Sequence, residues 1–346
     1  MSDAQVLASF ATQVTACESL GSPFTARVVA ACQANLNRTT DVGRKILDWP
    51  GDPTPRGDAV ALRLAGALHA LVMSGRAPAL AACYPPEAGA DPDALEAAVA
   101  AALVDHAGFI AGILERAPQT NEVGRSAALY AGLLVVADRA TPAVELLEIG
   151  SSAGLNLMLD RFSYDLGGRQ AGAAASAVRL RPRWTGSPPQ GPEPRIVGRR
   201  GCDLAPIDVR DPAERLRLRS YIWADQAERL ARQDAAVAIA LADPPVLDRM
   251  DAAEWVERQV ETEPTPGVTR VLMHSIAFQY LPENGRARVR AAMRRAGERA
   301  TRAAPLAWLS FEQADEGPAL SLQVWPGGKT VRLARADPHV SRMSWD

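Results

Sequence analysis

The chain has 346 residues, of which 47% are hydrophobic and 23% are charged. This length exceeds that of a typical single domain, so we expect two domains, or one large domain with an appendage. The 38 basic and 40 acidic side chains give a formal net charge of −2. Nucleic acids and membrane surfaces both attract basic proteins, so this balance argues against either as the main partner.

Other global features favour a soluble, cytoplasmic protein. The first residues, Met-Ser-Asp-Ala-Gln, show no basic stretch followed by an apolar one, so no signal peptide is expected. The uninterrupted apolar runs are far shorter than a membrane-spanning helix. The four cysteines form no CxxC pair and the four histidines show no metal-ligand spacing. Neither a disulfide framework nor a metal site is therefore predicted.

The first part of the chain, up to about residue 142, has the apolar spacing of helices. Breaks that contain Pro and Gly separate the periodic segments, and almost no alternating strand pattern lies between them. We therefore expect residues 1–142 to form an all-α domain that caps the rest of the chain. The expected helices are Val6–Val14, Phe24–Ala34, Ala59–Met73, Leu95–Leu114 and Val123–Ala137.

From residue 143 onward, short apolar runs alternate with helical segments. This alternation is typical of a parallel sheet with helices on both faces. Residues 143–346 are thus expected to form an α/β domain that ends in an antiparallel hairpin, because a Pro-Gly-Gly turn joins the last two runs. The expected strands are 144–149, 194–202, 245–250, 269–274, 306–312, 319–325 and 330–334, and the expected helices are 155–161, 227–242 and 286–303.

The stretch 162–195 fits neither pattern. It is rich in Gly, Pro and Arg, and it lies where a simple strand–helix–strand unit would pass directly into its second strand. We interpret it as an insertion that holds a small β-hairpin and a loop.

A glycine-rich turn after the first expected strand gives the sharpest local signal. It reads Glu148-Ile-Gly150-Ser-Ser152-Ala-Gly154-Leu-Asn156 and leads from a strand into a helix. Small residues at such a turn let backbone N–H groups and a helix N-terminus approach a ligand closely. Three interpretations compete for this turn.

The first interpretation is a class I S-adenosylmethionine-dependent methyltransferase, whose motif is an acidic residue at the end of the first strand followed by Gly-x-Gly-x-Gly. The sequence resembles this motif, with Ser152 in place of the middle glycine. The resemblance implies a Rossmann-like, mostly parallel seven-stranded sheet with S-adenosylmethionine as the cofactor. It also implies that Glu148 serves the methionine amino group and that the cofactor lies on Gly150, Ser151, Ser152, Gly154 and Asn156.

Segments after the later strands extend this resemblance. In the methyltransferase fold the second strand ends in an acidic residue that binds the ribose hydroxyls, which matches Asp203 here, with Asp208 as the second choice. An acidic residue near the adenine follows the third strand, which matches Asp251 with Ala252 beside it. The fourth strand runs into Ser275, which is expected at the cofactor.

The two other interpretations use the same turn. A dinucleotide-binding unit needs Gly-x-Gly-x-x-Gly, which this spacing does not provide. The run Gly150–Gly154 also satisfies Gly-x-Ser-x-Gly, the nucleophile elbow of α/β-hydrolases, with Ser152 as the nucleophile. Asp315 and His339 then follow in the order of a catalytic triad. The helical character of the chain before the turn and the lack of a His-Gly-Gly loop argue against a serine hydrolase.

Methyl transfer requires alignment of the acceptor with the methyl group, and a base where the acceptor must lose a proton. His274 is the candidate base because it is expected at the carboxyl end of the fourth strand, and Tyr280 follows in the segment expected to face the methyl group. Arg125 is expected to grip a carboxylate of a small-molecule substrate held between the two domains. The structural alternatives are a core histidine for His274 and a helix-capping cluster around Arg125.

The whole chain resembles an uncharacterised bacterial family, a domain of unknown function. The resemblance covers both halves of the chain and brings no activity with it. A non-catalytic protein on the same fold, which binds a nucleoside-like ligand or a protein partner, is therefore the alternative to the methyltransferase. The segments that carry the resemblance are 148–157, 164–168, 200–203, 223–226, 274–275, 279–280, 325–328 and 337–339.

Overall fold

The computed structural model describes residues 2–86 and 91–346. Contacts divide the chain into two compact units, of which the first comprises Met1–Thr120 with Arg210–Ala231 and the second comprises Asn121–Val209 with Arg232–Asp346. Each unit therefore draws on two separate stretches of the chain. The glycine turn and all the residues expected at the site belong to the second unit.

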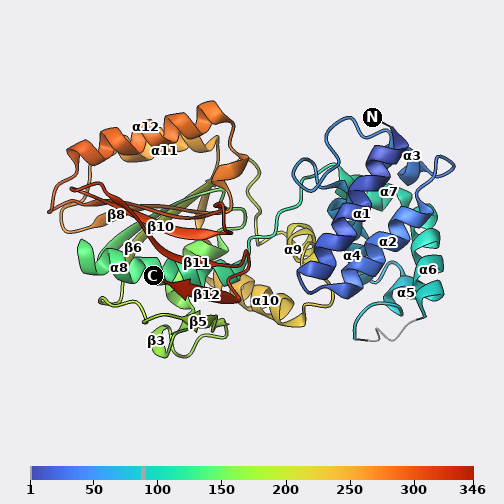
Figure 1. Ribbon diagram of the computed structural model, residues 1–346, viewed down its shortest axis with the longest axis horizontal. Helices are drawn as coiled ribbons and strands as arrows, with labels where there is room; N and C mark the ends of the chain where they lie inside the picture. Colours follow the sequence, from blue (N-terminus) through green and yellow to red (C-terminus); the bar gives the residue numbers. More distant parts are fainter. Residues whose placement is uncertain (1, 87–90) are drawn as a thin grey trace. The chain divides into compact units, whose positions relative to one another are not determined.

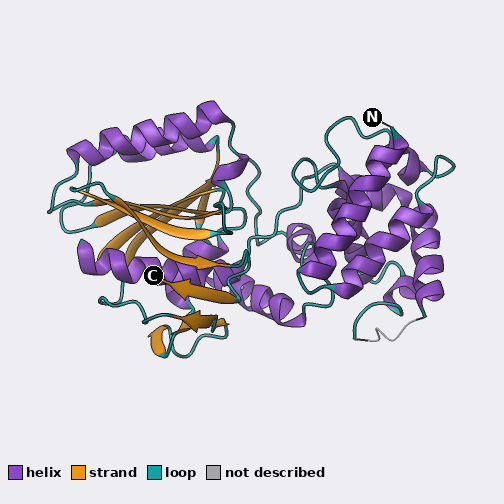
Figure 2. Ribbon diagram, viewed as in Figure 1, coloured by secondary structure: helices purple, strands orange, loops and turns teal. Residues whose placement is uncertain are grey.

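The first unit is built of helices and loops (Figures 1 and 2). Their apolar faces meet in one core, whose fully buried members include Phe10, Ile46 and Leu68. Burial of such side chains is the main favourable contribution to folding. The helices are α1 (Asp3–Ser19), α2 (Pro23–Asn35), α3 (Asp41–Leu47), α4 (Val60–Met73), α5 (Pro78–Ala81), α6 (Pro92–Asp105), α7 (Ala107–Leu114) and α9 (Pro212–Ser220).

The segment expected as one helix over Leu95–Leu114 is two helices, α6 and α7, bent by 85° at the break between them. His106 stands at the break with φ −118° and ψ 25°, which is not helical. The prediction was wrong here because apolar spacing continues on both sides of the bend. In the part of the chain that the structure describes, no single helix is long and apolar enough to cross a membrane, and only α6 with α7, as this bent pair, meets that criterion.

The second unit contains a large, mostly parallel sheet, which confirms the expected α/β class. Over the described residues it has nine strands in the order β5-β12-β11-β10-β9-β8-β1-β6-β7. The strands from β7 to β9 are parallel, and β9 to β12 form an antiparallel series. The main-sheet strands are β1 (Ala143–Ile149), β5 (Arg183–Thr185), β6 (Arg195–Asp203), β7 (Val246–Arg249), β8 (Thr269–Ser275), β9 (Leu306–Glu312), β10 (Ala319–Trp325), β11 (Thr330–Ala336) and β12 (Arg342–Trp345).

Helices cover both faces of this sheet (Figure 1). On one face α11 (Ala252–Glu261) and α12 (Glu283–Arg299) pack in one apolar cluster with Leu147 and Leu272 of the central strands. On the other face α8 (Ser126–Arg139) contacts β9 and β10. Gly132 permits this contact, because a Cβ atom there would lie 2.5 Å from Leu309 Cδ1. Helix α8 thus packs on the sheet, although it falls in the range expected for the helical domain.

The segment expected as an insertion forms its own small sheet. Strands β2 (Ser163–Leu166) and β3 (Arg169–Gly172) make an antiparallel hairpin, and β4 (Arg179–Leu180) pairs with β2 in parallel. The segment then returns to the main sheet, where β5 pairs with β12. The Trp184 ring stacks on the Trp345 ring at 5.5 Å between centroids. The remaining elements are α10 (Ala227–Ala242) and the short 3-10 helices η1 (Val123–Arg125), η2 (Leu155–Arg161) and η3 (Phe278–Tyr280).

Candidate functional site

The order of the parallel strands places the glycine turn where ligands commonly bind in open α/β sheets. Strand β1 lies between β6 and β8. The chain continues from β1 to β6 and β7 on one side, and later to β8 and β9 on the other. At such a reversal the loops after neighbouring strands separate and leave a crevice at the carboxyl ends. Residues 150–154 follow β1 directly at that edge.

The turn has an unusual backbone conformation at alternate positions. Gly150, Ser152 and Gly154 have φ values of 65°, 54° and 69°. Glycine adopts this left-handed region readily, whereas a serine is strained there. The Ser152 N–H donates to Asp203 Oδ2 at 3.0 Å, and the Ser151 N–H donates to the carbonyl of Cys202 at 3.0 Å. The end of β6 therefore holds the turn in this conformation.

Glu148, two residues before the turn, is a buried acidic side chain. Glu148 is 2% exposed, and its Oε2 atom has no hydrogen-bond partner among the described residues. Burial raises the pKa of this carboxyl well above its usual range, the negative charge of Asp203 raises it further, and Arg125 opposes the rise. The buried Ser152 Oγ likewise lacks a partner within the described chain.

A loop before α8 closes over the same edge. Asn121 Oδ1 accepts from the Leu155 N–H at 2.9 Å, and the Ser126 hydroxyl donates to Asn156 Oδ1 at 2.7 Å. Both contacts tie the start of α8 to the segment that follows the glycine turn. They explain why Asn156, expected at the cofactor, is 1% exposed.

Arg125 joins two further loops by donating to backbone carbonyls. Its Nη1 donates to the Ser275 carbonyl at 3.0 Å, and its Nε donates to the Pro338 carbonyl at 3.1 Å. The expected role of Arg125 was to grip a substrate carboxylate. In this structure its guanidinium fixes the end of β8 relative to the loop at 337–340.

Strained residues gather in these loops. Asn121, Ser152, Ile276 and Val340 have φ values of 33°, 54°, 48° and 55°, and they are four of the five non-glycine residues with positive φ in the described chain. Such conformations cost on the order of 1–3 kcal/mol each and are concentrated at functional sites. The contacts of Asn121, Arg125 and Asp203 connect the loops that carry them.

His274 is held on both ring nitrogens. Its Nδ1 donates to Glu312 Oε1 at 2.7 Å, and its Nε2 accepts from Trp308 Nε1 at 2.8 Å. An indole N–H only donates, so Nε2 accepts from Trp308 and Nδ1 is the ring nitrogen that donates to Glu312. Leu272 packs in the cluster with α11 and α12, so alternation places His274 on that face and Glu148 on the opposite one. The arrangement favours the structural alternative for His274.

Four other expected site residues have structural partners, begin a helix or lie exposed. Asp203 accepts through Oδ1 from the Ala205 N–H at 2.9 Å, besides its bond to Ser152. Asp251 caps α11 by accepting from the N–H groups of Ala253 and Glu254, both at 3.0 Å, and Ala252 is the first residue of that helix. Tyr280 is 70% exposed on η3.

The three residues expected for a hydrolase triad, Ser152, Asp315 and His339, do not form the contacts of a triad in the described chain. The Ser152 hydroxyl meets no histidine within hydrogen-bonding distance in the described chain. His339 Nδ1 lies 3.3 Å from Glu122 Oε2, and Asp315 is exposed between β9 and β10. Glu122 also accepts from the Gly124 N–H at 3.0 Å. Ser152 therefore lacks the base that would activate it as a nucleophile.

Sequence reasoning placed Asn121 in the polar cluster before α8 but missed Ser126 and Glu312 as parts of the site. Glu312 Oε1 accepts from His274 and from the N–H groups of Ala277 and Phe278, the latter two at 2.9 and 3.0 Å. The position of Glu312 at the carboxyl end of a buried strand was the only signal in the sequence. Among the described residues, no group of three or more His, Cys, Asp or Glu side chains could hold a metal ion.

Fold and site together define an α/β protein whose parallel strands carry a strained glycine turn and a buried acid at their carboxyl edge. The chain belongs to the family described as "Uncharacterized protein conserved in bacteria (DUF2332)", whose model matches residues 7–345. A search of curated proteins and a search of solved structures each gave no match.

Proposed function

We propose that this protein is an S-adenosylmethionine-dependent methyltransferase that acts on a small-molecule acceptor. One observation carries the proposal: all three glycine positions of the methyltransferase motif have left-handed backbone, including Ser152, where the residue itself disfavours it. The turn lies at the reversal point of a parallel sheet whose order, β7-β6-β1-β8-β9, is that of the first five strands of a Rossmann-type fold.

The residues present fit the cofactor in two respects. The Glu148 carboxyl is an unsatisfied buried group that would accept a hydrogen bond from the methionine ammonium, and the left-handed turn brings backbone close to the carboxyl edge of β1. The Asp203 carboxylate at the end of β6 would accept from the ribose hydroxyls only if its bonds to Ser152 and Ala205 rearrange. One approach to the turn is filled, because a Cβ on Gly150 would lie 2.5 Å from Ala277 Cβ.

Bound S-adenosylmethionine supplies a sulfonium methyl group that is displaced in line by the acceptor. The chain's own task is then to orient the acceptor and exclude water. Since both nitrogens of His274 are engaged, it does not serve as the base in this arrangement. The reaction proposed here therefore suits an acceptor that is already nucleophilic, which needs no protein base at the transferring methyl.

Calorimetric titration of the full chain with S-adenosylmethionine and S-adenosylhomocysteine tests the proposal. We expect both to bind. Glu148→Gln should weaken the affinity for each by about tenfold, because the ammonium of the bound compound would hold Glu148 ionised and the amide cannot form that ion pair. Glu298→Gln, a change of the same chemistry at an exposed position of α12, is the control. A folded protein that binds neither compound overturns the proposal.

The engaged His274 gives specific support to a second candidate, the non-catalytic nucleoside-binding protein. Binding of both compounds with no methyl transfer to any member of a metabolite panel would favour it over the enzyme. Labelling of Ser152 by a fluorophosphonate would instead support a serine hydrolase.

A further inference from the structure

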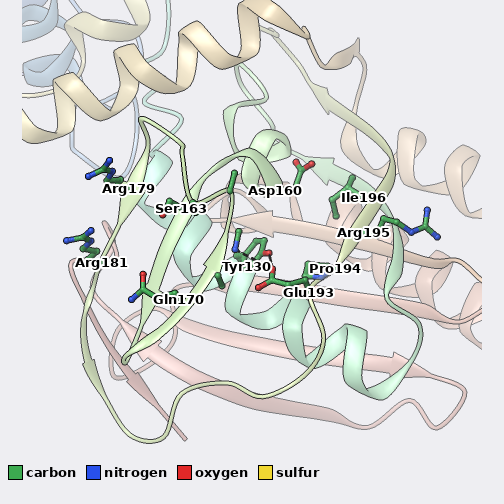
Figure 3. A pocket seen from close by; sticks show the side chains of 14 residues that line it. Tyr130, Asp160, Ser163, Gln170, Arg179, Arg181, Glu193, Pro194, Arg195 and Ile196 are labelled. Carbon is green, nitrogen blue, oxygen red and sulfur yellow. Dashed lines mark hydrogen bonds between the residues drawn. The ribbon is translucent and has the colours of Figure 1, made fainter.

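The inserted segment forms a pocket that shares no residue with the glycine-turn site. Its volume is about 920 Å³, within the range of small-molecule sites in proteins. The walls include residues of α8, of the small sheet and of the first part of β6 (Figure 3). All of these elements belong to the second unit.

Glu193 places a carboxylate in this hollow that has only neutral partners (Figure 3). Its Oε2 accepts from the Tyr130 hydroxyl and from the Gly172 N–H, the latter at 3.3 Å. Burial raises the pKa of the Tyr130 phenol above its usual range, and the hydrogen bond to Glu193 raises it further, so the phenol stays protonated and brings no charge. Within the described chain Glu193 forms no ion pair, and its Oε1 accepts no hydrogen bond.

Asp160, the other acidic side chain at the pocket, is compensated. Both of its oxygens accept from the Arg199 guanidinium, at 2.8 and 3.0 Å, and Arg161 Nε lies 3.5 Å from its Oδ2. Neither of these arginines lines the pocket. A bidentate pair of this kind leaves little net charge for a ligand. The negative charge that the hollow offers to a ligand is therefore that of Glu193.

Three arginines at the edges of the pocket do not oppose this charge from within. Arg179 and Arg181 stand at one edge of the hollow and Arg195 at the opposite edge, and their guanidinium groups are directed away from it (Figure 3). All three residues are exposed, so water and salt weaken their fields, with a screening length of about 8 Å at physiological ionic strength. A cation in the hollow would thus touch the Glu193 carboxylate and meet these arginines only through solvent.

The pocket is also built to keep its shape. The Tyr130 ring stacks on the Tyr164 ring with 4.2 Å between centroids, so the hydroxyl that holds the carboxylate is itself fixed. Arg169 donates to the carbonyls of Pro189 and Gly191, both at 2.6 Å, which fixes the loop between β5 and β6 where the carboxylate lies. A preformed hollow loses little ordering entropy when a ligand binds.

We propose that this pocket binds a small organic cation, a primary ammonium on an apolar body, whose ammonium donates to Glu193 Oε1. A guanidinium fork fits two oxygens of one carboxylate, whereas an ammonium is a point charge that one oxygen can receive. Since Glu193 Oε2 already accepts twice, the free Oε1 favours the ammonium.

The rest of the lining suits the apolar body of such an amine. Small or apolar residues line the pocket together with Glu193, and they are Ala171, Ala173, Ala174, Pro194 and Ile196. Ligand sites commonly combine an apolar lining with one charged group that fixes the orientation of the ligand. The insertion at 162–195 then has a function of its own, the construction of a second ligand site that is independent of what the glycine turn binds.

Calorimetry on the full chain tests this proposal with three probes that share one apolar body. Phenethylamine carries an ammonium, phenethyl alcohol a neutral hydroxyl, and hydrocinnamate a carboxylate. We expect the amine to bind at millimolar concentration or below, about fivefold more tightly than the alcohol, which is the upper value for an ion pair with an exposed carboxylate. Hydrocinnamate should not bind. No binding of the amine overturns the proposal, as does binding of the alcohol or the carboxylate with equal affinity.

Variants locate the ammonium. Glu193→Gln keeps an acceptor for the two neutral donors but removes the charge, so it should abolish the preference for the amine over the alcohol. Glu298→Gln, the same change at an exposed position of α12 outside the pocket, should leave that preference intact. The double change Arg179→Ala with Arg181→Ala removes positive charge from one edge and should leave the amine bound as tightly or more tightly. A preference retained in the Glu193 variant, an equal loss in the Glu298 variant, or weaker amine binding by the double variant contradicts the proposal.

Discussion

Ser152 is a serine whose backbone has a conformation that favours glycine. Its φ of 54° is where glycine would be unstrained, and its buried hydroxyl has no partner in the described part of the chain. We expect Ser152→Gly to raise the free energy of unfolding by up to about 1 kcal/mol, since relief of strain outweighs the added freedom of the unfolded chain. Chemical denaturation measures this difference.

Ser151→Gly is the matched control for that change. Ser151 is not among the residues with positive φ, and its hydroxyl donates to the Cys202 carbonyl at 3.1 Å. The same substitution should therefore lower stability there. A stability loss at both positions would contradict the strain argument for Ser152.

The raised pKa of Glu148 leads to a prediction about how the stability of the protein depends on pH. Because its folded pKa lies well above the ordinary value, the folded protein keeps a proton that the unfolded chain loses above about pH 4.3. Stability should then fall as pH rises from there, by about 1.4 kcal/mol per pH unit, until the folded pKa is reached. Glu148→Gln cannot ionise, so it should remove this slope and be more stable than the parent at neutral pH. Chemical denaturation of the parent and of the Glu148→Gln variant at several pH values measures both slopes. If the stabilities of the two proteins fall in parallel as pH rises, the prediction is wrong.

The sequence located some of these residues but not their partners. Glu148 and the turn at 150–154 are adjacent along the chain, so their proximity could be foreseen. The contacts of both His274 ring nitrogens could not, because Trp308 and Glu312 lie 34 and 38 residues further along. A lone histidine after a buried strand looks the same whether its nitrogens are free or engaged.

Among the elements, the loop between β8 and η3 depends on one side chain from β9. Glu312 Oε1 accepts from His274 and from the N–H groups of Ala277 and Phe278, and Ile276 beside them is a β-branched residue at φ 48°. Burial alone would raise the pKa of Glu312, but the hydrogen bond and electrostatic attraction of His274, together with the N–H groups of Ala277 and Phe278, outweigh it and lower the pKa. The carboxylate thus holds a strained loop against Gly150 of the glycine turn.

Glu312→Ala should release this loop. We expect the amide protons of Ala277 and Phe278 to exchange with solvent at least about tenfold faster, because each loses an acceptor that carries charge. Glu312→Gln keeps an acceptor oxygen and should restore much of the protection. Hydrogen exchange followed residue by residue measures both. Unchanged protection in the alanine variant would show that other contacts hold the loop.

Strands that carry their own apolar run were foreseen well, and two short strands without one were not. The expected strands at 306–312 and 319–325 match β9 and β10 residue for residue. Strands β5 and β12, with three and four residues, went unforeseen. They belong to the sheet because β12 pairs with β11 and β5 pairs with β12, and the Trp184 and Trp345 rings stack across that last pair. Such pairing between distant segments leaves no periodic signal in either one.

For the whole molecule, contacts between distant segments decide which unit a stretch of chain belongs to, more than the sequence pattern of its neighbours does. In the first unit His69 Nδ1 lies 3.2 Å from the carbonyl of Ser220, and a Cβ on Gly66 would lie 2.6 Å from the Tyr221 ring. Burial lowers the pKa of His69 to about 4, so the histidine is neutral at physiological pH. The stretch at 210–231 therefore completes the helical unit, although it lies in the middle of the α/β part of the sequence.

The contacts of α8 predict the residue at which a fragment containing the second unit must begin in order to fold. Eleven residues of α8 are buried, and the helix packs on β9 and β10. A fragment of residues 143–346 lacks this cover, and its exposed apolar sheet face should prevent a cooperative thermal transition and bind a hydrophobic dye. A fragment of residues 121–346 keeps α8 and should unfold cooperatively, as followed by near-ultraviolet circular dichroism. If both fragments unfold alike, α8 contributes little to the sheet and the unit begins at β1.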